Sequence, residues 1–114
     1  MGISFARPQI YGGIFNLYKN DLPRMGVDRT FVSVSPTDGG GGFAAAAAAA
    51  VEPGRTQLVW FEPCTNPTAS LVDVHAAVDA VKAADPECLV AVDNTFLTPY
   101  ALVSEEKYWK ICNG

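Results

Sequence analysis

Two carboxylates in this sequence stand directly after short apolar runs, where chemistry is readily positioned. Glu62 follows Gln57-Leu-Val-Trp-Phe, Asp93 follows Cys88-Leu-Val-Ala-Val, and a polar loop with an asparagine and a proline follows each acid. A carboxylate at the end of an apolar strand is costly unless it has a partner, and perturbed acids of this kind gather at functional sites. The alternative is that both acids cap loops or pair with surface cations. The residues alone leave both interpretations open.

The elements that must position these acids form a strand, a helix and a second strand. The runs at 57–62 and 88–92 are short and continuously apolar, which is typical of strands buried on both faces. Between them, apolar residues recur at helical spacing after Ser70, which stands three residues before Asp73 as a variant capping box. The recurring residues are Leu71, Val74, Val78 and Val81. Asp85-Pro86 should end the helix. This βαβ unit predicts parallel strands and an α/β fold, with both acids at the ligand-binding edge.

The first half of the chain predicts a helix, a strand and a low-complexity segment. Residues 13–26 favour a short helix, and Arg29 to Ser35 alternates apolar and polar residues like a strand. Four glycines and seven alanines follow at 39–50 and predict a linker feeding a featureless surface helix. A phosphate-binding loop is the weaker interpretation there, because no Lys-Ser/Thr follows and the glycines are not spaced. We divide the chain into 1–38, 39–55, a βαβ unit at 56–103, and a divergent tail at 104–114.

Composition narrows the class of protein. The chain has 114 residues, of which 49% are hydrophobic and 18% charged, and this is a globular composition. A net charge of −4 with scattered basic residues argues against nucleic acid as a partner. No apolar stretch is long enough to span a membrane, and no secretory signal is present at the start. Three cysteines without a paired spacing predict neither disulfides nor a metal site, so we expect a cytoplasmic protein.

Three ordered motifs carry a family resemblance. They are Tyr11-Gly-Gly13 with Leu22-Pro-Arg-Met-Gly26, then Glu62-Pro-Cys-Thr-Asn-Pro-Thr68, then Val92-Asp-Asn-Thr-Phe-Leu-Thr-Pro-Tyr100. Their residues and order resemble those of the trans-sulfuration (cystathionine lyase and synthase) enzymes, which depend on pyridoxal 5'-phosphate. The resemblance implies an incomplete, parallel-sheet portion of the large domain of a fold-type I pyridoxal-phosphate-dependent transferase. It also implies a sulfur amino acid as substrate and a homo-oligomer in the intact family.

The resemblance implies a role for each motif residue. Asp93 would hold the pyridinium nitrogen of the cofactor and keep it protonated. Tyr11 would stack on the ring, Asn66 would donate to the phenolic oxygen, and Thr95 would lie against the ring. Glu62 falls at a motif position and is expected to have a supporting role.

The sequence also departs from the family. The lysine that binds the cofactor covalently is expected in a Ser-Ala-Thr-Lys-Tyr motif, and Lys107 in Ser104-Glu-Glu-Lys-Tyr108 is a weak candidate for it. Two adjacent acids would raise the pKa of an amine that must be neutral to attack. No counterpart of the phosphate-gripping loop is found in residues 1–10. Two hypotheses follow: a fragment of a carbon–sulfur lyase or synthase, or a catalytically inactive, truncated relic that at most associates with full-length subunits.

Overall fold

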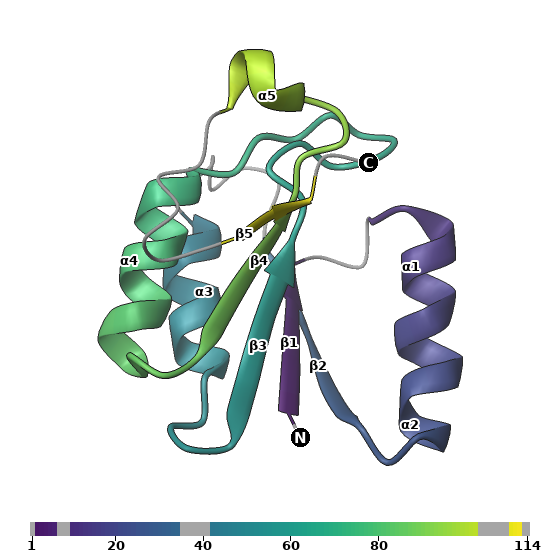
Figure 1. Cartoon of the computed structure of the whole chain (residues 1–114), viewed down its shortest axis with the longest axis vertical. Coiled ribbons are helices and arrows are strands. Elements are labelled where there is room, and N and C mark those ends of the chain that lie inside the picture. Colours follow the sequence, from purple (N-terminus) through teal and green to yellow (C-terminus); the bar gives the residue numbers. More distant parts are fainter. Residues whose placement is uncertain (1, 7–9, 35–41, 103–109, 113–114) are drawn as a thin grey trace.

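A five-stranded, all-parallel sheet with helices on both faces organises the chain (Figure 1). The computed structural model describes residues 2–6, 10–34, 42–102 and 110–112. Across the sheet, the strands are β2 (Asp28–Val32), β1 (Gly2–Ala6), β3 (Thr56–Phe61), β4 (Leu89–Asp93) and β5 (Lys110–Cys112). The helices are α1 (Gly12–Asn16), the π-helical η1 (Leu17–Asp21), α2 (Leu22–Arg24), α3 (Gly42–Ala50), α4 (Val74–Ala84) and α5 (Thr98–Ala101). The predicted α/β fold class is confirmed.

The βαβ unit that carries both acids is present as expected. β3 and β4 pair in parallel, with Leu58 opposite Leu89 and Phe61 opposite Val92. Helix α4 connects them and ends at Ala84, directly before Asp85. Because the two strands are parallel neighbours, Glu62 and Asp93 lie at the same edge of the sheet, where both strands end.

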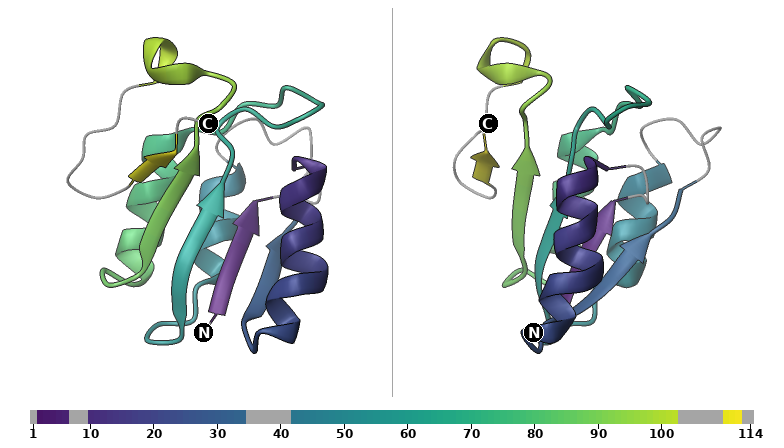
Figure 2. Two further views of the ribbon diagram at one scale, coloured as in Figure 1. Left: turned by 45° about the vertical axis from the view of Figure 1, so that its right-hand side comes forward. Right: turned by 90° about the vertical axis from the view of Figure 1, so that its right-hand side faces the viewer.

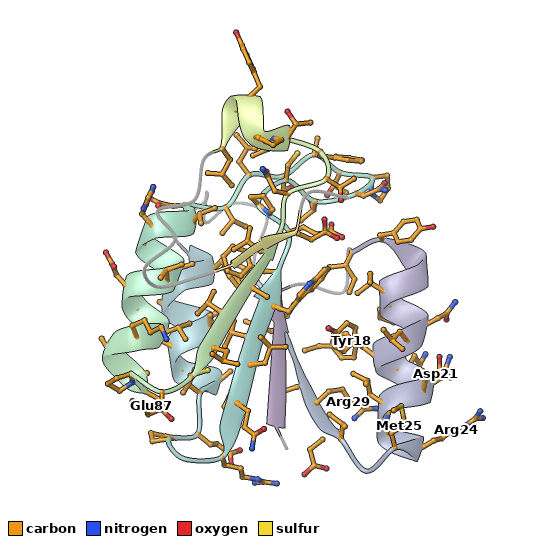
Figure 3. The ribbon with its side chains drawn as sticks, viewed as in Figure 1. Tyr18, Asp21, Arg24, Met25, Arg29 and Glu87 are labelled. Carbon is orange, nitrogen blue, oxygen red and sulfur yellow. The ribbon has the colours of Figure 1, made fainter. Side chains whose placement is uncertain are left out.

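Side chains on β3 alternate between two apolar layers. Val59 and Phe61 point into the main core, where the rings of Phe43 and Phe61 lie 5.0 Å apart under α3 and α4. Trp60 points to the opposite face and lies 5.9 Å from the ring of Tyr18. Figure 3 shows Tyr18 reaching from its helix toward the sheet, and Figure 2 shows that helix lying over the β1–β2 side. Both faces of β3 are therefore covered, as its continuous apolar sequence predicted.

The prediction of a featureless surface helix at the alanine run is wrong. α3 packs against α4, and Phe43, Ala44 and Ala47 are buried in the main core. Alanines allow close helix packing because they have no side-chain bulk beyond Cβ, so a run without an amphipathic pattern can still form part of a core. Residues 39–41 of the glycine run lie outside the described residues.

Two strands were not expected. β1 runs between β2 and β3, with Phe5 opposite both Phe31 and Trp60, so it is a central strand of the sheet. β5 lies in the tail that we expected to be divergent, and it extends the sheet beyond β4. Both are short, and pairing with neighbours far away in sequence stabilises such strands more than local propensity does.

The start of α4 also differs from the prediction. Its N-cap is Asp73, whose Oδ1 accepts a hydrogen bond from the Ala76 backbone N–H at 3.0 Å. Ser70 and Leu71 precede the helix. Leu71 is exposed and forms an isolated antiparallel β-bridge with Cys64. Aspartate at the N-cap fits the known preference, because its carboxylate satisfies a first-turn donor. Within the described parts of the chain, no helix has the length and apolar character needed to cross a membrane.

Candidate cofactor site

A cavity of about 390 Å³ opens at the carboxyl ends of β3 and β4. This volume falls in the range of about 300 to 1,000 Å³ that is usual for small-molecule sites. The cavity is lined by Tyr11, Ile14, Glu62, Cys64, Asn66, Asp93, Thr95 and Phe96. It therefore brings together all five residues that the motifs singled out as cofactor-binding or supporting.

Asp93 is the last residue of β4, and its carboxylate is held from one side. Its Oδ1 accepts hydrogen bonds from the backbone N–H of Thr95 at 3.1 Å and from the Thr95 hydroxyl at 2.5 Å. Within the described part of the chain, the hydrogen bonds to Asp93 all go to Oδ1. Oδ2 accepts no hydrogen bond from the described residues, and Thr95 fixes the orientation of the carboxylate.

Glu62 follows β3 directly and is 5% exposed. Its Oε1 accepts the backbone N–H of Tyr11 at 3.2 Å, and its Oε2 accepts the backbone N–H of Asn66 at 3.2 Å. Burial raises the pKa of Glu62 above its ordinary value, the two backbone donors lower it in part, and the charge of Asp93 raises it further. Glu62 thus connects the Tyr11 and Asn66 segments below the cavity.

Tyr11 precedes α1 and stands at the cavity with 58% of its surface exposed. Its ring lies over Gly13, where an added Cβ would stand only 2.7 Å from the Tyr11 Cε1 atom. A side chain at Gly13 would displace the ring, so the glycine of the Tyr-Gly-Gly motif leaves room for the ring in this position. Figure 1 shows that α1 begins at the end of the sheet where β3 and β4 finish.

The loop that presents Asn66 is built around Thr65, which is fully buried. The Thr65 backbone N–H donates to the Ser70 carbonyl at 3.1 Å, and the Ser70 N–H donates back to the Thr65 hydroxyl at 3.1 Å. The Ala69 N–H closes the turn on the Thr65 carbonyl at 2.8 Å. This set of local hydrogen bonds holds Asn66 at the edge of the cavity.

Sequence reasoning missed three lining residues, namely Ile14, Cys64 and Phe96. Each lies inside or beside a motif that was recognised, so position within the motif was the available signal. Asn94, in contrast, is fully buried and its amide donates to the Leu102 carbonyl at 3.3 Å. It anchors the loop after β4 and is not among the residues that line the cavity.

The described lysine side chains lie away from the cavity. Lys19 stands 5.4 Å from the centre of the Phe15 ring, and Lys82 donates to the carbonyls of Pro86 and Cys88. Lys107 lies outside the described residues, as do residues 1 and 7–9 of the segment 1–10 in which a phosphate-gripping loop was sought. Among the side chains that are described, no cluster of three or more His, Cys, Asp or Glu could hold a metal ion.

Comparison with known proteins places these features in a family. The family model for "Cys/Met metabolism PLP-dependent enzyme" matches residues 5–104. An L-methionine gamma-lyase of Treponema denticola is 36% identical over 95 residues, covering 83% of this chain and 22% of that protein. A cystathionine beta-lyase of Bacillus subtilis is 32% identical over 90 residues, covering 79% of this chain and 20% of that protein. The chain thus spans about a fifth of the length of these relatives.

Solved structures confirm the fold. An O-acetylhomoserine sulfhydrylase of Wolinella succinogenes superposes with a TM-score of 0.70 at 24% identity, covering 87% of this chain and 26% of that protein. A Campylobacter jejuni protein that carries N'-pyridoxyl-lysine-5'-monophosphate superposes with a TM-score of 0.70 at 20% identity. Fold, motif order and the family match over residues 5–104 agree: the chain belongs to the pyridoxal-phosphate-dependent enzymes of cysteine and methionine metabolism.

Proposed function

We propose that this chain supplies the ring-binding part of a pyridoxal-phosphate site in an enzyme that breaks or forms carbon–sulfur bonds of amino acids. The observation that supports this most is the convergence of Tyr11, Asn66, Asp93 and Thr95 on one cavity, with Asp93 Oδ2 accepting no hydrogen bond from the described residues. These residues come from three segments of the chain.

The side chains present suit the cofactor. Asp93 would pair with the ring nitrogen and hold a proton there, Tyr11 would cover one face of the ring, and Asn66 would donate to its phenolic oxygen. Thr95 would keep the carboxylate oriented through its two hydrogen bonds. When bound, the protonated ring withdraws electrons from the substrate, which is the chemistry that the cofactor supplies.

The substrate class rests on the relatives. Those that cover most of this chain are named for methionine and cystathionine, so we propose a sulfur amino acid of the cystathionine type. The free cysteines Cys64 and Cys88 fit a reducing compartment, and we propose a cytoplasmic protein that forms homo-oligomers as part of an intact enzyme.

A second candidate is a catalytically inactive chain that at most associates with full-length subunits. The observation in its favour is that no lysine is found among the described residues that line the cavity. Covalent catalysis needs a nucleophile, and Lys107, which follows two glutamates, is the remaining weak candidate. In this hypothesis the cavity would hold the cofactor without a covalent bond.

Cofactor binding by the purified chain tests the first proposal. We expect Asp93→Asn to weaken binding of pyridoxal phosphate by about tenfold or more in equilibrium dialysis, since a charged hydrogen bond contributes roughly 1.5–3 kcal/mol. With ¹⁵N-labelled cofactor, the ring nitrogen should be protonated at neutral pH in the unchanged chain and lose that proton in the variant. Asp79→Asn, at an exposed position of α4, is the matched control. Equal affinity and a protonated nitrogen in Asp93→Asn would contradict the assignment.

Borohydride treatment separates the two candidates. After incubation with pyridoxal phosphate and reduction, peptide mass spectrometry locates any lysine that carries the cofactor. A single stoichiometric adduct at Lys107 supports an active enzyme fragment. Reversible binding without an adduct, together with co-purification of a full-length family member, supports the inactive chain.

A further inference from the structure

We propose that Glu62 is a positioning residue that holds Tyr11 and Asn66 in place around the cofactor through their backbone N–H groups. This inference rests on the proposed function, because it concerns the same cavity. It concerns a residue whose motif position implied no more than a supporting role.

The contacts of Glu62 join segments that are far apart in sequence. Tyr11 lies 51 positions before Glu62 and directly precedes α1, whereas Asn66 lies 4 positions after Glu62 in the loop beyond β3. Each segment contributes residues that line the cavity. One carboxylate therefore holds the backbone of both segments at the cavity.

Both oxygens of Glu62 are engaged, so the acid cannot be replaced by its amide without loss. Oε1 accepts a hydrogen bond from the backbone N–H of Tyr11 and Oε2 accepts one from the backbone N–H of Asn66, each with an N···O distance of 3.2 Å. A glutamine has one carbonyl oxygen, and its NH₂ group would face the other backbone N–H, donor against donor. Glu62→Gln should therefore release one of the two segments while leaving the size of the side chain almost unchanged.

The surroundings of Glu62 indicate that the acid has more than a structural role. A 5% exposed carboxylate near Asp93 is unfavourable, and burial together with the Asp93 charge raises its pKa. No cationic side chain is among the causes of this shift within the described residues. Local costs of this kind are typical of functional sites.

Asp85 provides a matched control at the other end of the sheet. It is 8% exposed, its Oδ2 accepts the Gly54 N–H at 2.8 Å, and its Oδ1 accepts the Glu87 N–H at 2.9 Å. Figure 3 shows Glu87 at the end of the molecule opposite to that where β4 finishes. Asp85→Asn makes the same chemical change to the same kind of contact, away from the cavity.

The test combines two measurements on the full chain and its Glu62→Gln and Asp85→Asn variants. The first is the backbone amide ¹H shift of Tyr11 and Asn66 without cofactor, which reports the hydrogen bonds to Glu62 directly. The second is the dissociation constant for pyridoxal phosphate. We expect Glu62→Gln to move at least one of the two amide signals upfield and to weaken binding by at least about tenfold, given how strongly misplacement of site residues is felt. Asp85→Asn should leave the amide signals of Tyr11 and Asn66 in place and change the dissociation constant by less than about twofold.

Electrostatics sharpens the interpretation. The cofactor carries an anionic phosphate and, beside Asp93, a protonated ring nitrogen, so the charge of Glu62 acts on it in both directions. The amide signals of Tyr11 and Asn66 therefore show whether a weaker affinity in Glu62→Gln comes from geometry. Asn66→Ala and the double variant complete a cycle: if Glu62 acts through Asn66, the two losses will be less than additive.

The outcomes separate this inference from the proposed function. Unmoved amide signals in Glu62→Gln, or moved signals with unchanged affinity, would overturn the positioning role. If the unchanged chain fails to bind the cofactor, the proposed function fails, while the amide signals still show whether Glu62 holds both segments. If Glu62→Gln unfolds, Asn66→Ala with intact Glu62 takes its place. Binding of Asn66→Ala equal to that of the unchanged chain would then overturn the inference.

Discussion

Glu62 and Asp85 make the same kind of contact at opposite ends of the sheet, in opposite electrostatic surroundings. Each is a buried carboxylate that accepts backbone N–H groups from two segments. The pKa of Asp85 is lowered from its ordinary value, first by the Gly54 and Glu87 donors and also by the charge of Lys82. The pKa of Glu62 is raised, because burial outweighs its two donors and Asp93 adds repulsion. The same contact is thus favourable at one end and carries a cost at the other.

This difference indicates that the carboxylate at one end of the sheet stabilises the fold, whereas the carboxylate at the other end belongs to a ligand site. At the Asp85 end, the carboxylate, its donors and a nearby cation agree, as expected of a residue that serves the fold. At the Glu62 end, two acids share an open cavity. A bound cofactor with a protonated ring nitrogen beside Asp93 would relieve this repulsion, which the fold by itself does not.

The largest expected effect comes from the core that both ends share. Phe43 of α3 is fully buried against Phe61, the residue before Glu62. We expect Phe43→Ala to lower the free energy of unfolding by about 3–5 kcal/mol through loss of burial and creation of a cavity. Met25→Ala, at a 73% exposed position, should change it by less than about 0.5 kcal/mol. Urea unfolding followed by circular dichroism measures both, and equal losses would contradict the buried role of α3.

A smaller effect is expected from pH, because the contributions of Glu62 and Asp85 to the free energy of unfolding should depend on pH in opposite directions. The folded pKa of Glu62 lies above its ordinary value of 4.5, so the unfolded state ionises first. Its contribution to stability should therefore fall as the pH rises from 4.5 through the folded pKa. The folded pKa of Asp85 lies below 3.8, so its contribution is present above that pH and is lost as the pH falls through the folded pKa.

Unfolding free energies measured across this range distinguish the two acids. Glu62→Gln should remove the decline toward neutral pH and keep the acid-induced loss. Asp85→Asn should do the reverse. If both variants remove the same part of the pH dependence of the unfolding free energy, the assignment of opposite pKa shifts is wrong.

The sequence predicted which residues gather at the cavity better than it predicted the packing around them. Glu62 and Asp93 were identified because apolar runs and motif positions coincide at strand ends, and parallel pairing brings those ends together. The burial of α3 was not predicted, because a run of alanines has no amphipathic pattern from which to read a face. β1 was missed because five residues carry little periodicity, and its central place depends on pairing with β2 and β3.

Contacts between residues far apart in the sequence could not be predicted either, because local sequence patterns do not specify them. The hydrogen bond from Tyr11 to Glu62 joins positions 51 apart, and no local pattern encodes it. The start of α4 shows the limit at short range, since Ser70 and Asp73 are both good N-cap residues. The structure shows that Asp73 caps the helix.

The most direct test of the central claim is a titration of the ¹⁵N-labelled chain with pyridoxal phosphate, followed by backbone amide spectra. The account predicts saturable shifts at Tyr11, Asn66 and Thr95, which line the cavity, and none at Gly54 and Glu87, the partners of Asp85 at the opposite end. Shifts confined to the Asp85 end, or no saturable shift at the cavity residues, would contradict the claim that the carboxyl end of this sheet is the cofactor site.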